Sequence, residues 1–343
     1  MRAAVVHEHG SFDQILLEER PTPEPGPGEV RVRVRAAALN HLDTWVRRGV
    51  PGHTFPLPLV LGCDGAGEVD ALGAGVTNVK PGERVSIAPG FGCGTCEVCA
   101  AGQDQLCRKY GIFGETRDGT NAEYVCVPSR NVLPMPAGQT FEEAAAWPLT
   151  YLTAWHMLTR RLELRPGETI LIHAAGSGVS AAAIPMAKLL GAHVIATAGS
   201  DEKCKKAVDL GAAAAVNYEK VDFAAEVRTL TKKRGVDCVV NHVGAKTFDG
   251  DMKLLVKGGR LVTCGATAGF EMKTDFRLVF FKGLSILGST MGSLGELHEV
   301  SRLLHAGKLR PVIDSAFPLA RVADAHRRIA DRAVFGKVVL TIP

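Results

Sequence analysis

Short apolar stretches separated by Gly and Pro turns fill the first part of the chain, from Met1 to about Trp147. Apolar and polar residues alternate in several of them, as in EVRVRVRAAAL at 29–39 and AEYVCVP at 122–128. Alternation with a period of two, bounded by Gly and Pro, is typical of strands with one buried face. We therefore expect an all-β domain in this part of the chain.

The pattern changes after Arg165, where apolar runs alternate with helical stretches. TILIHAA at 169–175 precedes an apolar helix that reaches Leu190, and HVIATA at 193–198 precedes the helical DEKCKKAVDL. The runs AAAVNY, VDCVVNHV, RLVTCG and LSILGST continue the series. Near-continuous apolar strands of this kind are buried on both faces of a parallel sheet. Residues 151–289 are therefore predicted to form a doubly wound Rossmann domain of about six strands.

The tail beyond Gly292 returns to mixed patterns, with a helix near 296–305, the strand-like PVIDSAFPL, a second helix and the terminal strand KVVLTI. We expect these elements to rejoin the N-terminal part. The prediction is thus an α/β protein of two domains, residues 1–150 with 290–343 and residues 151–289. A length of 343 residues, 46% of them hydrophobic, is enough to give each domain a core.

The net charge and the N-terminal sequence exclude some classes of binding partner. The net charge of +4 is spread along the sequence, which argues against nucleic acid or a membrane surface as main partner, so any anion site must be local. No apolar stretch reaches the roughly 20 residues of a membrane span, and MRAAVVHEHG lacks the layout of a signal peptide. We expect a cytoplasmic protein that acts on a small-molecule substrate.

Four of the nine cysteines lie within fifteen residues and share one loop: Cys93, Cys96, Cys99 and Cys107. Four soft thiolates are the ligand set of a closed tetrahedral zinc site. Gly92, Gly94 and Gly102 allow the loop to curl around an ion. An iron–sulfur cluster also uses four thiolates, but the chain lacks a second cluster motif. Because four thiolates leave no open position, we expect a structural zinc that stabilises a lobe at about 90–110, with the chemistry elsewhere.

A glycine turn joins the first parallel strand to its helix, with the sequence Ala175-Gly176-Ser177-Gly178-Val179-Ser180. The N–H groups of a helix start bind pyrophosphate. The second strand ends at Ala198, where NAD enzymes usually carry a carboxylate for the ribose. Ser200 and Lys203 stand there instead and suit a 2′-phosphate, so NADP(H) is favoured over NAD(H). Asp201 keeps NAD(H) open if it turns to the ribose, and is otherwise a helix-start residue.

Together these motifs resemble the medium-chain dehydrogenase/reductase superfamily, which contains zinc alcohol dehydrogenases and quinone reductases. The cysteine loop is similar to its structural-zinc lobe, Gly62-Cys63-Asp64-Gly65-Ala66-Gly67 to its Gly-His-Glu segment, and Gly235-Val236-Asp237 with Gly258-Gly259-Arg260 to its cofactor domain. The resemblance implies a GroES-like β-barrel for the N-terminal domain, an active site in the cleft between domains, and a homodimer or homotetramer. It also implies a set of cofactor-binding residues: Thr153, Gly176, Ser177, Gly178, Val179, Ser200, Lys203, Tyr218 and Gly265.

The departures from the family pattern concern the catalytic zinc. Asn40-His41-Leu42-Asp43 stands where zinc alcohol dehydrogenases have Cys-His-Ser/Thr-Asp. Cys63 and Asp64 occupy the histidine and glutamate positions, and the usual third ligand falls on Leu149. A catalytic zinc needs three protein ligands and an open fourth position. Cys63 and Asp64 could supply two, with His41 or Asp43 as the third.

Two mechanisms and one non-enzymatic reading follow. Without a catalytic zinc, hydride passes between nicotinamide and a carbonyl, enone or quinone polarised by hydrogen-bond donors, with Asn40, His41 and Asp43 as the candidate lining. With a zinc near Cys63 and Asp64, the metal would lower the pKa of a bound alcohol while Asp43 orients a ligand. The alternative from another class is a non-catalytic NADP(H)-binding protein. We expect the zinc-free enzyme.

Overall fold

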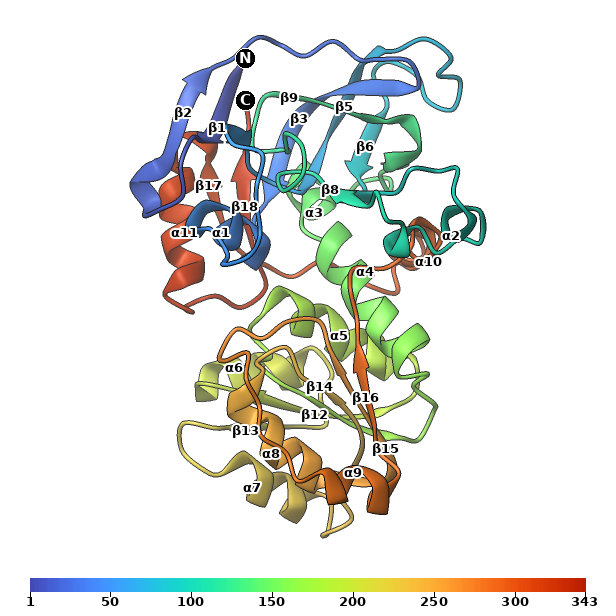
Figure 1. Cartoon of the computed structure of the whole chain (residues 1–343), viewed down its shortest axis with the longest axis vertical. Coiled ribbons are helices and arrows are strands. Elements are labelled where there is room, and N and C mark those ends of the chain that lie inside the picture. The colour runs from blue at the N-terminus through green and yellow to red at the C-terminus, as the bar shows by residue number, and fades with distance from the viewer. The chain divides into compact units, whose positions relative to one another are not determined.

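A computed structural model describes all 343 residues, and the chain divides into two compact units (Figure 1). Unit 1 comprises Met1–Leu152 and Ser293–Pro343, and unit 2 comprises Thr153–Gly292. The limits expected for the central domain, 151 and 289, differ from those of unit 2 by a few residues. The tail that follows unit 2 thus returns to the unit in which the chain begins.

Unit 2 is built on one six-stranded sheet. Its strands are β11 (Thr169–Ile172), β12 (His193–Ala198), β13 (Ala214–Asn217), β14 (Val236–Val240), β15 (Leu255–Thr263) and β16 (Ser285–Gly288). Every neighbouring pair is parallel, and the order across the sheet is β13-β12-β11-β14-β15-β16. Counted from β11, this is the order 3-2-1-4-5-6 of the Rossmann fold. The predicted doubly wound domain is confirmed.

One helix precedes the first strand, and five more alternate with the strands as the sequence indicated. They are α4 (Pro148–His156), which continues as a π-helical turn to Arg161, α5 (Gly178–Leu189), α6 (Asp201–Asp209), α7 (Phe223–Leu230), α8 (Ala245–Leu254) and α9 (Phe276–Lys282). The core joins strand residues such as Leu171 and Val239 to Val227 of α7 and Met252 of α8, all of them buried. This packing removes the apolar face of each helix from water, which is the main source of its stability.

One strand is longer than predicted. β15 begins at Leu255, five residues before the apolar run RLVTCG at 260. Leu255 pairs with Val236, and after an irregularity Arg260 pairs with Cys238. The intervening Gly258 has a φ of 74°, a backbone conformation that favours glycine. Two glycines that look like a loop in the sequence therefore form a bulge within the strand.

Unit 1 consists mainly of antiparallel strands. Its largest sheet contains β3 (Glu29–Ala38), β5 (Asp64–Leu72), β6 (Arg84–Ile87), β9 (Tyr124–Pro128), β10 (Val132–Pro134), β17 (Ile313–Pro318) and β18 (Lys337–Thr341). Smaller sheets are formed by β1 (Arg2–Val6), β2 (Ile15–Glu19) and β4 (Leu59–Val60), and by β7 (Gly90–Phe91) and β8 (Gly111–Ile112). β18 pairs with β3 and β17 with β18, so the C-terminal tail lies in the same sheet as the strands of the first part of the chain.

The expectation that the first 147 residues are all-β was wrong in three places. They contain α1 (His41–Arg48), α2 (Glu97–Ala100) and α3 (Phe141–Ala145), and the tail adds α10 (Leu294–His305) and α11 (Val322–Ala330). Single 3-10 turns lie at 12–14, 104–106, 129–131 and 319–321. The early helices are too short to leave a clear period, but α3 begins with a capping box between Thr140 and Glu143. None of the helices is long and apolar enough to span a bilayer.

Candidate functional site

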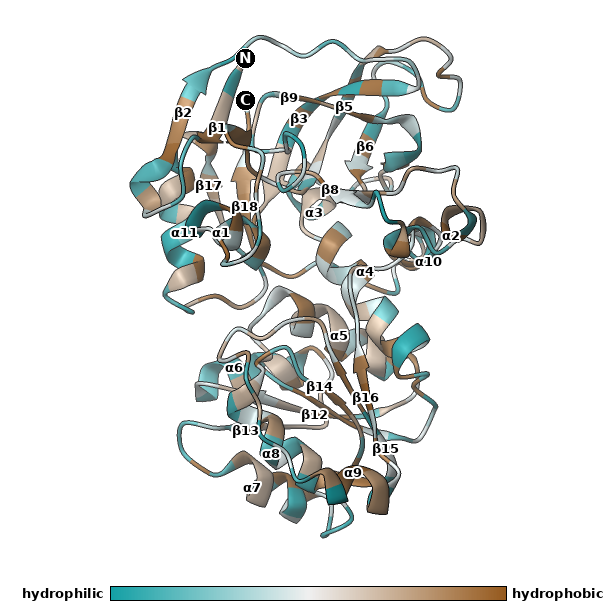
Figure 2. Ribbon diagram, viewed as in Figure 1, coloured by the Kyte–Doolittle hydropathy of each residue, from teal (hydrophilic) through white to brown (hydrophobic).

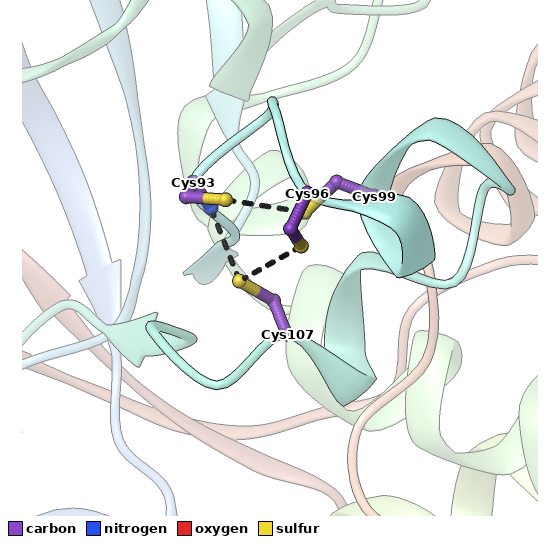
Figure 3. A group of neighbouring side chains, drawn as sticks. All are labelled: Cys93, Cys96, Cys99 and Cys107. Carbon is purple, nitrogen blue, oxygen red and sulfur yellow. Dashed lines mark hydrogen bonds between the residues drawn. The ribbon is translucent and has the colours of Figure 1, made fainter.

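The four cysteines of the loop turn their sulfur atoms toward one another (Figure 3). Their ligand atoms all lie within 4.8 Å of one another. Cys93 Sγ is 4.0 Å from Cys99 Sγ, and Cys96 Sγ is 3.7 Å from Cys107 Sγ. Zinc–thiolate bonds of about 2.3 Å in a tetrahedron place sulfur atoms about 3.8 Å apart. The cluster therefore fits a closed, four-coordinate zinc ion.

Backbone N–H groups of the loop stabilise the thiolate form of Cys93 and Cys107, which is the form that a zinc ion binds, whereas burial raises the pKa of Cys99 to about 12. Hydrogen bonds from Thr95, its backbone N–H first, lower the pKa of Cys93 to about 5. The N–H groups of Cys93 and Lys109 donate to Cys107 Sγ at 3.4 and 3.3 Å and lower the pKa of that thiol. A Cβ atom at Gly92 would lie 2.8 Å from Cys99 Sγ, so a side chain there would displace a ligand. The distances between the sulfur atoms and the lowered pKa values of Cys93 and Cys107 thus both favour zinc binding.

A second polar cluster is buried at the start of α1 and β5. The Lys337 ammonium, on the first residue of β18, donates to Asn40 Oδ1 at 2.6 Å and to Asp64 Oδ2 at 2.8 Å. Asn40 Nδ2 donates to the same Asp64 oxygen at 2.9 Å and to Cys63 Sγ at 3.2 Å. The other oxygen of Asp64 accepts from the N–H of Leu149 at 2.8 Å. Lys337 is 3% exposed and Asp64 is fully buried, so this ion pair is shielded from water.

Asp43 fixes the backbone around this cluster. Its carboxylate accepts from the N–H of Asn40 at 2.7 Å and from the N–H of Gly62 at 2.9 Å, which ties the first turn of α1 to the residue before Cys63. Burial raises the pKa of Asp43 to about 6 although both hydrogen bonds oppose the shift. Gly62 has a φ of 96°, and a Cβ atom there would overlap Asn121. The turn that presents Cys63 therefore depends on glycine.

Four of the five candidate catalytic residues meet in this cluster: Asn40, Asp43, Cys63 and Asp64. His41 begins α1 but its side chain is exposed, and it makes none of these contacts. Lys337 was missed by the sequence analysis. A charged residue at the start of the otherwise apolar strand KVVLTI was the available signal, because a lysine is buried only when it is paired.

The glycine turn of unit 2 is braced by hydroxyl and imidazole groups. Ser177 caps α5, and its Oγ accepts from the N–H of Ser180 at 3.1 Å. Ser180 Oγ donates to the carbonyl of His173 at 2.6 Å and lies 2.8 Å from His242 Nε2. The hydroxyl at 180 is thus satisfied within the turn. The remaining first-turn N–H groups of α5, on Gly178 and Val179, have no partner inside the helix and suit a phosphate.

A buried hydrogen-bond chain connects the carboxyl ends of β12, β11 and β14. His173 Nε2 donates to Asp251 Oδ1 at 2.6 Å, and His173 Nδ1 lies 3.0 Å from Thr197 Oγ1. Asn241 Nδ2 donates to the other oxygen of Asp251 at 2.7 Å, while Asn241 Oδ1 accepts from the N–H of Gly244 at 2.8 Å. These contacts hold the His173 ring within unit 2, and Ser180 Oγ lies beside the His242 ring. Ligands of open α/β sheets bind at these strand ends.

The residues after β12 and β13 lie where a Rossmann domain contacts the ribose of a bound dinucleotide. Ser200 caps α6 and accepts from the N–H of Lys203 at 3.2 Å. A Cβ atom at Gly199 would lie 2.8 Å from the hydroxyl of Tyr218, so that hydroxyl is close to the end of β12. Asp201 instead binds Asn217 Nδ2 at 2.7 Å and the ammonium of Lys220.

Two further cofactor candidates lie elsewhere in unit 2. Thr153 is buried in α4. Gly265 follows β15, and its carbonyl accepts from Thr263 Oγ1 at 2.9 Å. This hydrogen bond holds the loop after β15 close to its strand.

Comparison with known proteins places this architecture. Residues 26–137 match the model of the alcohol dehydrogenase GroES-like domain, and residues 178–306 match that of the zinc-binding dehydrogenase. An NAD-dependent alcohol dehydrogenase of Sulfolobus acidocaldarius is 33% identical over the whole of both chains. A quinone oxidoreductase of Pseudomonas aeruginosa is 34% identical over 89% of this chain and 88% of the relative. A crystal structure of an NAD-dependent alcohol dehydrogenase superposes with a TM-score of 0.97 at 52% identity, covering all of both chains.

A GroES-like unit joined to a Rossmann unit, with a cysteine cluster that could hold zinc, defines a class of nicotinamide-dependent dehydrogenases. The chain belongs to the medium-chain dehydrogenase/reductase superfamily, among the zinc-containing alcohol dehydrogenases and quinone reductases. It is an NAD(P)-dependent oxidoreductase.

Proposed function

We propose that the chain is an NADP(H)-dependent oxidoreductase that transfers hydride between nicotinamide and a carbonyl, enone, quinone or alcohol without a catalytic zinc. The observation that carries this proposal is the ion pair of Lys337 with Asp64, bridged by Asn40. The chemistry of hydride transfer belongs to the bound cofactor. The residues of the chain bind that cofactor and supply a donor for the substrate oxygen.

The ion pair disfavours a zinc ion at Cys63 and Asp64. Both oxygens of Asp64 already have partners, and the Lys337 ammonium lies 2.8 Å from one of them. A zinc ion at this carboxylate would stand beside a second positive charge in a site that water does not screen. Cys63 is buried, and burial together with the Asp64 and Asp43 carboxylates raises the pKa of its thiol, which opposes the thiolate form. The residues as arranged therefore fit a zinc ion poorly.

The same cluster retains a donor for a substrate oxygen. Both N–H bonds of the Asn40 amide point to Asp64, Cys63 and the carbonyl of Ala38, so Asn40 positions its neighbours. The Lys337 ammonium has three N–H bonds and two partners. We assign to its third N–H the task of polarising a carbonyl or quinone oxygen, which zinc performs in metal-dependent relatives.

Counting zinc tests this proposal against the zinc-dependent alternative. We expect one zinc per chain in the native protein and none in Cys93→Ser, with metal content measured by mass spectrometry and activity measured on the same samples. Two zincs per chain, one of which survives Cys93→Ser and is lost in Cys63→Ser, would support the zinc-dependent alcohol dehydrogenase with ligands Cys63 and Asp64.

Turnover separates the enzyme from a non-catalytic cofactor-binding protein. We expect NADPH oxidation with at least one member of a panel of enones, quinones and aldehydes, and a loss of kcat in Lys337→Met. Binding of NADPH without oxidation by any member of the panel would contradict the enzymatic proposal.

The preference for NADP(H) is supported by the surroundings of Ser200. Asp201, the nearest carboxylate, is held by Asn217 and Lys220. Ser200 and the Tyr218 hydroxyl lie beside the end of β12, and Lys203 is in the first turn of α6. We expect kcat/KM for NADPH to exceed that for NADH at least tenfold. Ser200→Asp should reverse the ratio because its carboxylate repels the 2′-phosphate; a native ratio below one would overturn the preference.

Compartment and assembly complete the proposal. None of the nine cysteines forms a disulfide, which fits a reducing compartment, and we place the protein in the cytoplasm. We also propose a homodimer or homotetramer. β16 is an edge strand paired only with β15, and Figure 2 shows β16 in the brown of apolar residues. The neighbouring helix α9 exposes three phenylalanines, Phe276, Phe280 and Phe281.

A further inference from the structure

A basic pocket of about 430 Å³ lies in unit 2, at the opposite ends of the strands from the glycine turn. It is formed where α7 and α8 end and where β14 and β15 begin, with α9 on one side. Six cationic side chains line it: Arg228, Lys233, Arg234, Lys253, Lys257 and Lys282. No aspartate or glutamate is among the lining residues. We call this cavity the basic pocket.

Three of the six positive charges already have partners. Arg234 forms a two-pronged ion pair with Asp237, at 2.7 and 2.9 Å, and Lys253 pairs with Asp249 at 2.6 Å. Lys282 Nζ donates to the carbonyls of Met252, Lys253 and Leu255 at 2.8 to 3.1 Å, which completes the end of α8. These contacts account for Arg234, Lys253 and Lys282 as structural residues.

The other three cations, Arg228, Lys233 and Lys257, have no carboxylate partner and are exposed. Arg228 donates to the carbonyl of Lys253 at 3.3 Å, the same carbonyl that accepts from Lys282 at 3.0 Å. The guanidinium and the ammonium are therefore held side by side with no acid between them. Like charges in this arrangement repel, and an anion that entered the pocket would relieve the repulsion.

We propose that the basic pocket binds a small phosphorylated anion, as a site separate from the cofactor site. Phosphate oxygens match the donors of Arg228, Lys233 and Lys257. The volume lies within the range of small-molecule sites, and the partly exposed Val256 and Leu278 give the pocket an apolar side for the rest of the ligand. A small ligand fits better than nucleic acid, because the net charge of the chain is only +4 and is spread along the sequence.

Titration with inorganic tripolyphosphate tests this site. The calorimetric titration uses protein saturated with NADPH, so that the cofactor site is already filled. We expect one tripolyphosphate per chain, bound at least tenfold more weakly by the double variant Lys233→Gln, Lys257→Gln. The matched control is Lys80→Gln, Lys308→Gln, which removes two exposed lysines of unit 1 and should change the affinity less than twofold.

Three outcomes would overturn the proposal. The first is that the pocket variant binds tripolyphosphate as tightly as the native protein, and the second is that saturation with NADPH abolishes the binding. The third is that a single-stranded oligonucleotide binds to the pocket lysines while tripolyphosphate does not. Thermal unfolding of both double variants verifies that the fold is intact. Because the readout is binding to NADPH-loaded protein, its failure does not depend on whether the proposed hydride transfer occurs.

Discussion

His326 is a fully buried histidine on α11 with no hydrogen-bond partner for either ring nitrogen. Burial, and then the nearby charge of Arg47, lowers its pKa to about 3. In the unfolded chain the pKa of histidine is about 6.5. Between these values the unfolded state binds a proton that the folded state does not, so stability falls as the pH falls below about 6.5. His326 thus makes unit 1 sensitive to acid.

We predict that His326→Leu removes part of this sensitivity. Native protein at pH 5 should lose about 2 kcal/mol through this residue relative to pH 7 or above, and the variant should lose that much less. Urea unfolding at both pH values measures the difference. His53→Asn, a change of an exposed histidine in the same unit, is the control. Equal losses in native and His326→Leu protein would contradict the burial argument.

The pair of Asp64 and Lys337 yields a second prediction at this scale. Lys337→Met leaves a buried carboxylate without its counter-ion, and such changes cost about 3–5 kcal/mol. We expect a lower melting temperature and a loss of turnover. The double variant Lys337→Met, Asp64→Asn should recover most of the stability but little of the turnover, because the donor is still absent. Native turnover in the double variant would show that Lys337 serves structure alone.

The contrast between the cysteines and Lys337 shows what sequence reveals about single residues. Cys93, Cys96, Cys99 and Cys107 are close in sequence, so their spacing already indicated that they converge. Lys337 is 297 residues from Asn40, and its contact arises because β18 pairs with β3 beside the start of α1. Local spacing carries no information about a contact made by strand pairing over that distance.

At the scale of elements, the cysteine loop should behave as a structural clamp. Zinc bound by four thiolates contributes directly to folding free energy. We predict that Cys93→Ser, or removal of zinc by a chelator, lowers the first unfolding transition by several degrees. The kcat of protein that remains folded should stay within about threefold of native, since the clamp holds no open ligand position. Cys204→Ser, which lies outside the loop, is the control for stability. A kcat that falls to background in folded zinc-free protein would instead assign chemistry to this loop.

Helices and strands were predictable where a segment was long enough to show its pattern of apolar residues. The parallel strands of unit 2 stand out because both faces are buried, which gives continuous apolar runs such as Ile170 to Ile172. Helix α1 was missed because it has eight residues, and its start is defined by Asp43 accepting from the N–H of Asn40. A capping contact of this kind involves only two residues. The alternating apolar and polar residues of the strands on either side therefore mask the short helix in the sequence.

For the whole molecule, the alternation of strand and helix predicted the doubly wound parallel sheet of unit 2, since the parallel crossover rules leave few topologies, but the strand order itself was not predicted. The return of the C-terminal tail to unit 1 was predicted, but its partner strand was not. Pairing of β18 with β3 depends on packing that no local pattern records. The basic pocket likewise arises from four separate segments of unit 2, whose lysines look unremarkable in the sequence.

Assembly is the last property argued at this scale. The edge of β16 offers unpaired backbone groups, and α9, the preceding element, leaves Phe280 60% and Phe281 71% exposed. A soluble monomer that displays an unpaired apolar edge tends to aggregate, and pairing with a second copy about a two-fold axis satisfies the edge. A second copy is the natural partner because the same strand and the same aromatic residues then meet their equivalents.

We therefore predict that the protein is at least dimeric and that Phe280→Glu, Phe281→Glu releases monomers, because buried carboxylates without partners would oppose the interface. Light scattering coupled to size-exclusion chromatography measures the mass of each species. Leu106→Glu, at an apolar residue of unit 1 that is 54% exposed, should leave the assembly intact. If the native protein is monomeric at micromolar concentration, or if the double variant keeps the native mass, β16 and α9 are not the interface, and their exposed aromatic residues need another explanation.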